Sequence, residues 1–360
     1  PVWVENYFGE ILIVRIIFEK GIAITYLLAF FNALNQFRPL LGKRGLLPAP
    51  EFLRLTNFRN TPSIFHFHYS DRFAMFIAWL GIIMSLLIIL GLVSELPWWI
   101  SIIIWLTLWF LYLSIVNVGQ TFYSFGWESM LCEAGFFAAF LGPHDLEPSV
   151  IPILILRWML FRVELGAGLI KLRHDPCWRD YTCLYYHYET QPMPGPLSWH
   201  FHHFPKFIHR FGVMFSHFVQ VVVPFGLFAP QPVAGFAAIL IITHQLWLIF
   251  CGNYSWLNWL TVVLGFTALS DSFLQTIIPI SIVVLQPRPL PFDVALYALL
   301  VMTLILSWKP LLNFFSEDQL MNYSYNPYHL VGVYGAFGSI TKERYEIIIE
   351  GTEDDYLKQT

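Results

Sequence analysis

The sequence predicts an all-α polytopic membrane protein that continues into the start of a C-terminal β-rich soluble domain. Hydrophobic residues make up 57% of the 360 positions and charged residues only 12%, whereas soluble domains carry about 25% charged residues. The mean hydropathy is +0.59, and long apolar runs recur along most of the chain. The final segment, 311–360, is by contrast polar and charged. A bilayer can accommodate this much apolar surface, whereas a soluble globule of this size cannot.

Membrane helices are predicted wherever about 20 mostly apolar residues run together, the length that crosses the hydrocarbon core. The segments of this length are 11–31, 73–93, 98–118, 150–171, 211–229, 233–250 and 290–308. Two further candidates are shorter or more polar, 121–141 and 255–270. Segment 272–286 is apolar but interrupted by Pro279, so we expect it to lie along the membrane interface. The expected total is eight to ten membrane segments.

The predicted domain organisation divides the chain near residue 310. Residues 1–310 form the helical membrane domain, from which a loop over 172–209, rich in His, Tyr, Trp and Pro, projects. Within 311–360, the run Tyr-Glu-Ile-Ile-Ile-Glu at 345–350 predicts a strand. We therefore expect 311–360 to be the start of a β-rich domain that the chain end truncates.

The charge balance excludes a nucleic-acid-binding protein and leaves the bilayer as the expected surroundings. Lys and Arg number 20 against 24 Asp and Glu, which gives a net charge of −4, and no Lys/Arg-rich run occurs. The most basic stretch is 32–72, which the positive-inside rule places in the cytoplasm. If segment 11–31 begins in the cytoplasm, the same stretch lies on the opposite side. Both orientations stay open.

Charged side chains within the predicted spans mark positions of special interest, because a charge at the bilayer centre costs about 2.5–3.5 kcal/mol. In segment 150–171, Arg157, Glu164 and Lys171 follow one another at intervals of seven residues. Seven residues bring an α-helix back to within about 20° of the starting direction, so these three share one stripe. Arg162 points elsewhere. An acid of segment 121–141 is the expected partner of Arg157 or Arg162.

The expected acids are Glu128 and Glu133. A polar face that includes Glu128 is predicted if one helix continues through the two glycines of this region; its members are Asn117, Gln120, Ser124 and Glu128. Arg15 and Glu19 lie four residues apart and are expected to pair on their own helix. Three interpretations stay open: ion pairs that orient helices, a polar cavity for a ligand or for catalysis, and a transport pathway. We favour the first, because the two matching halves typical of transporters are absent from the sequence.

The cysteines indicate an oxidising compartment. Cys177 and Cys183 lie close together in the 172–209 loop, where such a pair forms either a disulfide or a metal site. We favour the disulfide and expect no metal. Cys132 and Cys251 are expected to be free and buried. The sequon at Asn322 predicts a glycan and a lumenal tail.

Motifs for common catalytic chemistry do not occur. The sequence contains no P-loop, nucleophile elbow or dinucleotide fingerprint, so we expect neither a cofactor nor a catalytic residue of these classes. Several histidines cluster in loops without a carboxylate or cysteine at ligand spacing, which favours an interfacial polar surface over a metal site. These are His66, His68, His200, His202, His203 and His209.

The loop after the charged helix carries an unusual sequence. The run His-Tyr-Glu-Thr-Gln-Pro at 187–192 follows Asp-Pro-Cys-Trp-Arg-Asp at 175–180. These runs closely resemble the lipase maturation factor family. Further stretches that are similar to this family lie at 33–42, 127–136, 157–172, 192–199, 252–258 and 334–339.

The resemblance implies a non-enzymatic, multi-pass glycoprotein of the endoplasmic reticulum membrane. Members of this family act as chaperones that help secreted lipases fold, assemble and leave the cell in active form. Secreted lipases are then the clients, and other folding factors of this compartment are further candidate partners. The resemblance also implies that residues 172–209 and about 325–360 face the lumen and contact the client.

Aromatic residues of the 172–209 loop are the expected client-binding residues, because ordered aromatic side chains give contact area at a low entropic cost. We predict this role for Trp178, Tyr185, Tyr186 and Trp199. In this hypothesis the charged helices and the disulfide hold the loop in one shape at the membrane surface.

A weaker likeness points to a different activity. Ala167-Gly168 and Lys171-Leu172 are similar to the stretch around the active-site lysine of vitamin K-dependent gamma-glutamyl carboxylase. This likeness implies an alternative function, a membrane-embedded enzyme that uses Lys171 as its base. A small-molecule transporter is the second alternative.

Overall fold

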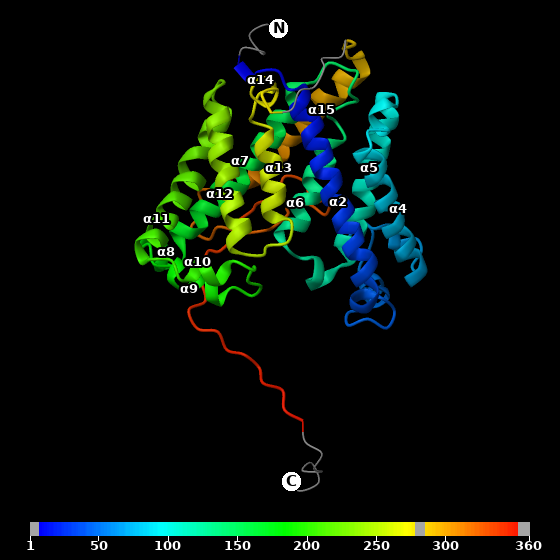
Figure 1. Cartoon of the computed structure of the whole chain (residues 1–360). Helices are drawn as coiled ribbons and strands as arrows, with labels where there is room; N and C mark the ends of the chain where they lie inside the picture. Colours follow the sequence, from blue (N-terminus) through cyan, green and yellow to red (C-terminus); the bar gives the residue numbers. More distant parts are fainter. Residues whose placement is uncertain (1–6, 278–284, 352–360) are drawn as a thin grey trace, which may run out of the picture.

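The computed structural model describes residues 7–277 and 285–351 and shows a bundle of helices (Figure 1). In the first half of the chain the longer helices are α2 (Leu12–Leu41), α4 (Asp71–Ile89), α5 (Trp98–Val118), α6 (Gly126–Ala138) and α7 (Val150–Arg173). In the second half they are α11 (Lys206–His217), α12 (Val233–Cys251), α13 (Leu257–Phe266) and α15 (Leu290–Leu306). Short helices occupy the connections: α3 (Ala49–Leu55), α8 (Pro176–Arg179), α9 (Leu184–Thr190), α10 (Ser198–His202), α14 (Asp271–Leu274) and α16 (Trp308–Asn313).

Within the residues that the structure describes, five helices are long and apolar enough to cross a membrane, which indicates a multi-pass membrane protein. These spans are Asp71–Ile89, Trp98–Val118, Lys206–Phe228, Val233–Cys251 and Leu290–Asn313. The predicted count of eight to ten segments is therefore not supported. The apolar runs predicted at 121–141 and 255–270 become the short helices α6 and α13. Of segment 272–286, residues 278–284 lie outside the described residues.

Helix α7 runs through the interior of the bundle. Of its 24 residues, 17 are buried, and it packs against α6, α13, α15 and the continuation of α11. Two glycines allow this close packing: a Cβ on Gly166 would collide with the carbonyl oxygen of Tyr334, and a Cβ on Gly168 would lie 2.7 Å from Val221. The charges of α7 are therefore surrounded by protein, where polar partners are available, rather than by lipid.

The continuation of α11 is irregular. A π-helical turn (Phe218–Val222) and a 3-10 turn (Val223–Phe228) follow it. Pro224 lacks the backbone N–H that would donate to Gln220 in a regular helix, which explains why the α-helical pattern fails here. This π-turn carries Gln220, which is 4% exposed.

The continuous helix that a polar face from Asn117 to Glu128 would require does not form. Helix α5 ends at Val118, residues 120–123 form a 3-10 turn, and α6 begins at Gly126. The polar residues of this stretch therefore do not share one face. Asn117 instead donates hydrogen bonds to the carbonyls of Pro62 and Pro327.

The C-terminal segment corrects the expectation of a β-rich domain. Within the described residues no strand occurs, and the only trace of β pairing here is an isolated bridge between Tyr323 and Val333. Residues 316–340, which we call the strap, run back along the helices and bury Leu330, Val331 and Val333. The predicted strand at 345–350 is extended and exposed, because no neighbouring strand is present among the described residues to pair with it.

The loops between helices divide between the two ends of the bundle. Residues 174–205, which contain α8, α9 and α10 and which we call the cap, lie at the end of the bundle opposite the start of α2 (Figure 1). The connection between α2 and α4, and the described end of the chain, lie at the same end as the cap (Figure 1). The basic stretch and the cysteine pair of the sequence therefore face one side.

Candidate functional site: a polar cavity beneath the cap

The polar centre of the bundle is built on α7. This helix is continuous, so Arg157, Glu164 and Lys171 lie along one stripe. Arg157 is fully buried and donates from Nε to the carbonyl of Thr267 at 2.9 Å and from a terminal nitrogen to that of Leu227 at 3.3 Å. No acid of the described residues pairs with it. Arg157 therefore pairs with backbone carbonyls instead of the expected acid. These carbonyls lie at the C-terminal ends of neighbouring helical segments, where they have no partner within the helix.

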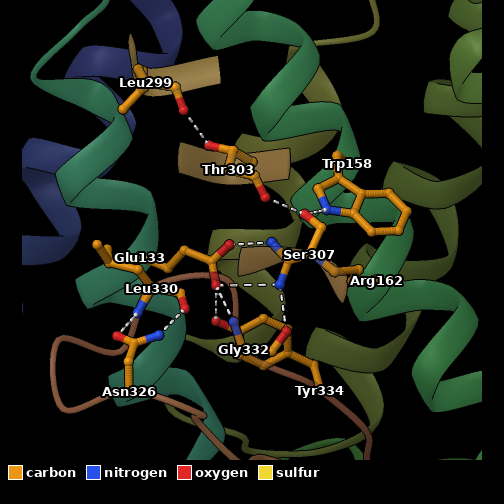
Figure 2. Close-up of polar contacts among 10 residues, drawn as sticks. All are labelled: Glu133, Trp158, Arg162, Leu299, Thr303, Ser307, Asn326, Leu330, Gly332 and Tyr334. Atoms are coloured by element: carbon orange, nitrogen blue, oxygen red, sulfur yellow. Dashed lines mark hydrogen bonds and ion pairs between the residues drawn. The ribbon is translucent and has the colours of Figure 1, made fainter. Parts of the chain in front are cut away.

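The second arginine of α7 forms a buried ion pair (Figure 2). The guanidinium of Arg162 meets the carboxylate of Glu133 on α6, and both side chains are almost fully buried. Arg162 also donates to the carbonyl of Gly332. The same carboxylate accepts the backbone N–H of Gly332 at 3.0 Å and the hydroxyl of Tyr334 at 2.7 Å. This pair therefore fixes the strap to α6 and α7.

The stripe ends at Lys171, which is 3% exposed. Its ammonium donates to Gln220 Oε1 at 2.7 Å and reaches Ser216 Oγ at 3.4 Å. It also lies 4.9 Å from the centre of the Trp178 ring. Two turns earlier on α7, Glu164 accepts a hydrogen bond from Gln245 at 2.7 Å. Amides from α12 and the π-turn thus separate the two charges.

Lys171 lies between two cavities. The larger has a volume of about 740 Å³ and the smaller about 170 Å³, and both are lined by Lys171, Leu248 and Phe337. The walls of the larger cavity are mainly aromatic and aliphatic, with amides and hydroxyls between them. A volume of this size, with apolar walls and few polar groups, is typical of small-molecule sites.

The cap is attached to the bundle above these cavities. Cys177 and Cys183 form a disulfide, so their sulfurs are bonded to each other and are not thiolate ligands for a metal. Asp175 begins α8 by accepting the backbone N–H of Cys177, and its second oxygen accepts that of Ile340 at 3.2 Å. The indole of Trp178 donates to the carbonyl of Phe337 at 2.7 Å. The strap thus holds the cap as well as α6 and α7.

Comparison with known proteins identifies this helical architecture. A family model described as the lipase maturation factor transmembrane domain matches residues 13–276. The chain belongs to the lipase maturation factor family.

Curated relatives extend this assignment over nearly the whole chain. Lipase maturation factor 1 of Homo sapiens is 38% identical over 96% of this chain, and that of Mus musculus is 37% identical over 96%. Lipase maturation factor 2 of Xenopus tropicalis is 33% identical over 73% of the chain. The chain spans 67% and 66% of the two former relatives and 40% of the third. No solved structure matches the chain.

The aromatic residues that the family resemblance suggested for client binding differ in exposure. Trp199 is 65% exposed, whereas Tyr185 and Tyr186 are half-buried. Trp178 is only 3% exposed, because its indole packs beneath the cap against Lys171 and the strap. The expectation that Trp178 presents an exposed surface is therefore wrong.

The predicted pair on the first helix is also wrong. Arg15 donates to the carbonyls of Leu146 and His144, both at 3.0 Å, instead of to Glu19. Glu19 lies 2.7 Å from His144 Nε2. The connection between α6 and α7 offers carbonyls closer to the guanidinium than its own helix offers a carboxylate. Glu128 likewise has no arginine partner among the described residues: it accepts hydrogen bonds from the Tyr112 hydroxyl and the Trp127 indole.

A histidine of the cap contributes to the site by staying neutral. His187 Nε2 lies 2.8 Å from the hydroxyl of Tyr254, which in turn donates to Gln191. Burial lowers the pKa of His187 to about 4, and the positive charge of Lys171 acts in the same direction. An uncharged imidazole at this position joins the cap to the connection between α12 and α13 without a buried charge.

Several residues of the site escaped sequence reasoning. Gln220 and Asn258 line the large cavity, and Tyr334 reaches Glu133 from a distant segment. The spacing of Ser216 and Gln220, four residues apart in an apolar run, was the one signal that could have indicated the partner of Lys171. No local pattern marks Tyr334, because its contact depends on the path of the strap.

Proposed function

We propose that this chain is the membrane part of a factor that assists the folding, assembly and secretion of active lipases in the endoplasmic reticulum. Support comes from relatives whose names describe lipase maturation and which match 96% of the chain. Secreted lipases are then the clients, and other lumenal folding factors are further candidate partners. The factor acts by contact and not by catalysis.

One observation carries the proposal: the cap is fastened to the membrane bundle from several sides. The disulfide closes it, the strap binds it through Asp175 and Trp178, and Gln191 donates to the carbonyl of Cys251 at 3.1 Å. A surface held in one shape loses little conformational entropy when a partner binds. This is what a protein that repeatedly receives partly folded clients requires.

Exposed apolar side chains of the cap supply the proposed contact surface. Trp199 is 65% exposed and Met193 63%, with Leu197 at 42% and Tyr181 at 40%. Tyr185 and Tyr186, which are half-buried, are the other proposed contact residues. Trp178 supports the surface from beneath. A partly folded lipase exposes apolar segments, which such a patch would cover.

Trp199→Ala in the full-length factor tests this surface. The variant is expressed in cells that lack the endogenous factor, and secreted lipase activity is compared with lipase mass and with the abundance of the factor. We expect lower lipase activity per cell at unchanged factor abundance, because Trp199 makes few contacts within its own chain. Phe67→Ala is the matched control, since Phe67 is 77% exposed at the same end of the bundle but outside the cap. An equal loss with both variants would contradict a specific role for the cap.

The proposed orientation places the cap in the lumen. The disulfide supports this side, because such bonds persist in oxidising compartments, whereas the basic stretch at the same end favours the cytoplasm under the positive-inside rule. Asn322 is exposed and lies in a sequon near this end. We expect Asn322→Gln to abolish a glycosidase-sensitive mobility shift. Asn253→Gln removes the other sequon of this end and serves as the comparison. A factor without any glycan at either position would contradict the lumenal orientation.

A further inference from the structure

The larger cavity is lined by a cation, Lys171, that has no ion-pair partner at contact distance among the described residues. Among the described residues, no carboxylate lies within ion-pairing distance of Lys171 Nζ, and its partners are the neutral side chains of Gln220 and Ser216. An ammonium has three donors, and only one of its contacts is short. Lys171 lines the cavity itself, so a further acceptor can reach it from that side.

A second polar group lacks a partner in the same cavity. Asn258 on α13 is 3% exposed and lines the cavity, and its side-chain nitrogen makes no hydrogen bond. A buried amide donor left without an acceptor costs about 1–3 kcal/mol. Beside the smaller cavity, His244 Nδ1 is also without a partner. The Asn258 amide is therefore free to donate to an acceptor that enters the larger cavity.

An acid in the cavity wall already accepts hydrogen bonds from other side chains. Glu128 lines the cavity and accepts hydrogen bonds from the hydroxyl of Tyr112 and the indole of Trp127. Glu164 accepts from Gln245 through Oε1, whereas its Oε2 is buried without a hydrogen-bond partner. Neither carboxylate is hydrogen-bonded to Lys171, which keeps its charge available for an external anion.

The rest of the cavity wall is apolar and suits a hydrocarbon chain. Phe122, Trp127, Met130, Leu248 and Trp256 contribute to it. Water would gain few hydrogen bonds along such walls, whereas an acyl chain buries apolar area there at roughly 25 cal/mol per Å². The volume of about 740 Å³ exceeds what one such chain occupies.

We propose that this cavity binds a single-chain anionic lipid, with a carboxylate or phosphate head at Lys171 and Asn258 and the acyl chain along the aromatic wall. The strap closes one side through residues 334–337. The site adjoins the proposed client-binding surface of the cap, because Met193 lines the cavity as well. Bound lipid would accept hydrogen bonds from Lys171 and from the unpartnered Asn258, and it would fill the space between α7, α13 and the strap.

Binding of tritiated oleate to the full chain, purified in a neutral maltoside detergent, tests the proposal. We expect saturable binding that Lys171→Met weakens by about tenfold or more, the effect of losing a charged hydrogen-bond partner. Oleyl alcohol, which has the same chain without the charge, should bind weakly and equally to both proteins. Lys206→Met is the matched control, because Lys206 is an exposed lysine at the same end of the bundle and does not line the cavity.

Two further variants keep the test decisive if Lys171→Met folds poorly. Ala336→Trp fills the cavity from the strap and leaves Lys171 in place, so oleate binding should again fall by about tenfold. Asn258→Leu should weaken oleate binding while raising thermal stability, because it removes the unpartnered amide.

Three outcomes would overturn the proposal. The first is oleate binding that is equal in the wild type and in folded Lys171→Met and Ala336→Trp. The second is equal affinity for oleate and oleyl alcohol in the wild type. The third is competition by free acetate or phosphate at the affinity of oleate itself, which would identify a site for a soluble anion instead of a lipid.

Discussion

Two opposite faces of α7 each bury a cation, but the partners of the two cations differ. Arg162 and Lys171 lie nine residues apart, which places them on opposite sides of the helix. Their exposed fractions are 1% and 3%. Arg162 meets a carboxylate and a carbonyl, whereas Lys171 meets an amide, a hydroxyl, an aromatic ring and a cavity. Burial of a charge therefore does not reveal its role; the degree to which its partners satisfy it does.

Breaking the satisfied pair should have the largest effect. Glu133→Gln leaves Arg162 as a buried cation without a counter-ion, so we expect the free energy of unfolding to fall by about 3–5 kcal/mol. Denaturation of the purified chain in mild detergent measures this change. Asp293→Asn is the control: it breaks the half-exposed Arg288–Asp293 pair, which contributes about 0–1 kcal/mol. Equal losses of unfolding free energy in the two variants would show that the buried Arg162–Glu133 pair stabilises the fold no more than an exposed pair does.

The cap side of Lys171 should be sensitive to pH. The pKa of His187 is about 4 in the folded chain and about 6.5 when unfolded. Between these values the unfolded state binds a proton that the folded state does not, so stability falls as the pH drops from about 6.5 towards 4. At about 1.4 kcal/mol per pKa unit the loss reaches at most about 3 kcal/mol. Melting temperatures of the wild type and His187→Gln, recorded from pH 7 to pH 4, measure it. An identical pH dependence in both proteins would contradict a neutral, buried His187.

Two tryptophans of the cap are expected to have different roles, because Trp178 is buried and Trp199 is exposed. Trp178→Phe deletes the hydrogen bond to the Phe337 carbonyl beneath the cap, so we expect a loss of about 1–3 kcal/mol. Trp199→Phe alters an exposed ring and should change stability by less than about 0.5 kcal/mol. Thermal unfolding of both variants measures the difference. A stability loss at position 199 that matches the loss at 178 would show that the exposed ring also supports the fold.

Removing the unsatisfied cation should have the smallest effect on stability. Lys171→Met deletes a buried charge together with its desolvation penalty, and Gln220 Oε1 keeps a contact with Ser216 at 3.3 Å. We expect a change of less than about 1 kcal/mol in either direction. The same denaturation assay applies. A loss of unfolding free energy as large as that of Glu133→Gln would mean that Lys171, like Arg162, only stabilises the fold.

The sequence predicts the positions of the helices better than it predicts the contacts between them. The spans at 98–118 and 233–250 agree closely with α5 and α12, because an apolar run of helical length specifies its own backbone hydrogen bonds. The disulfide was also predictable from two nearby cysteines in one loop. The separate segments 98–118 and 121–141 anticipated the break between α5 and α6, whereas the polar face that required one continuous helix does not form.

The composition, the apolar runs and the idiosyncratic loop by themselves determined that this is a helical membrane protein of the lipase maturation factor family. These properties are local, because each helix satisfies its own main chain and each motif is a stretch of adjacent residues. The tertiary structure alone decided that Glu133 neutralises Arg162, that Trp178 is covered, and that residues 316–340 form a strap instead of a β-sheet. Each of these outcomes depends on segments far apart in the chain, and whether a buried charge or aromatic ring finds a partner there is not encoded in its own neighbourhood.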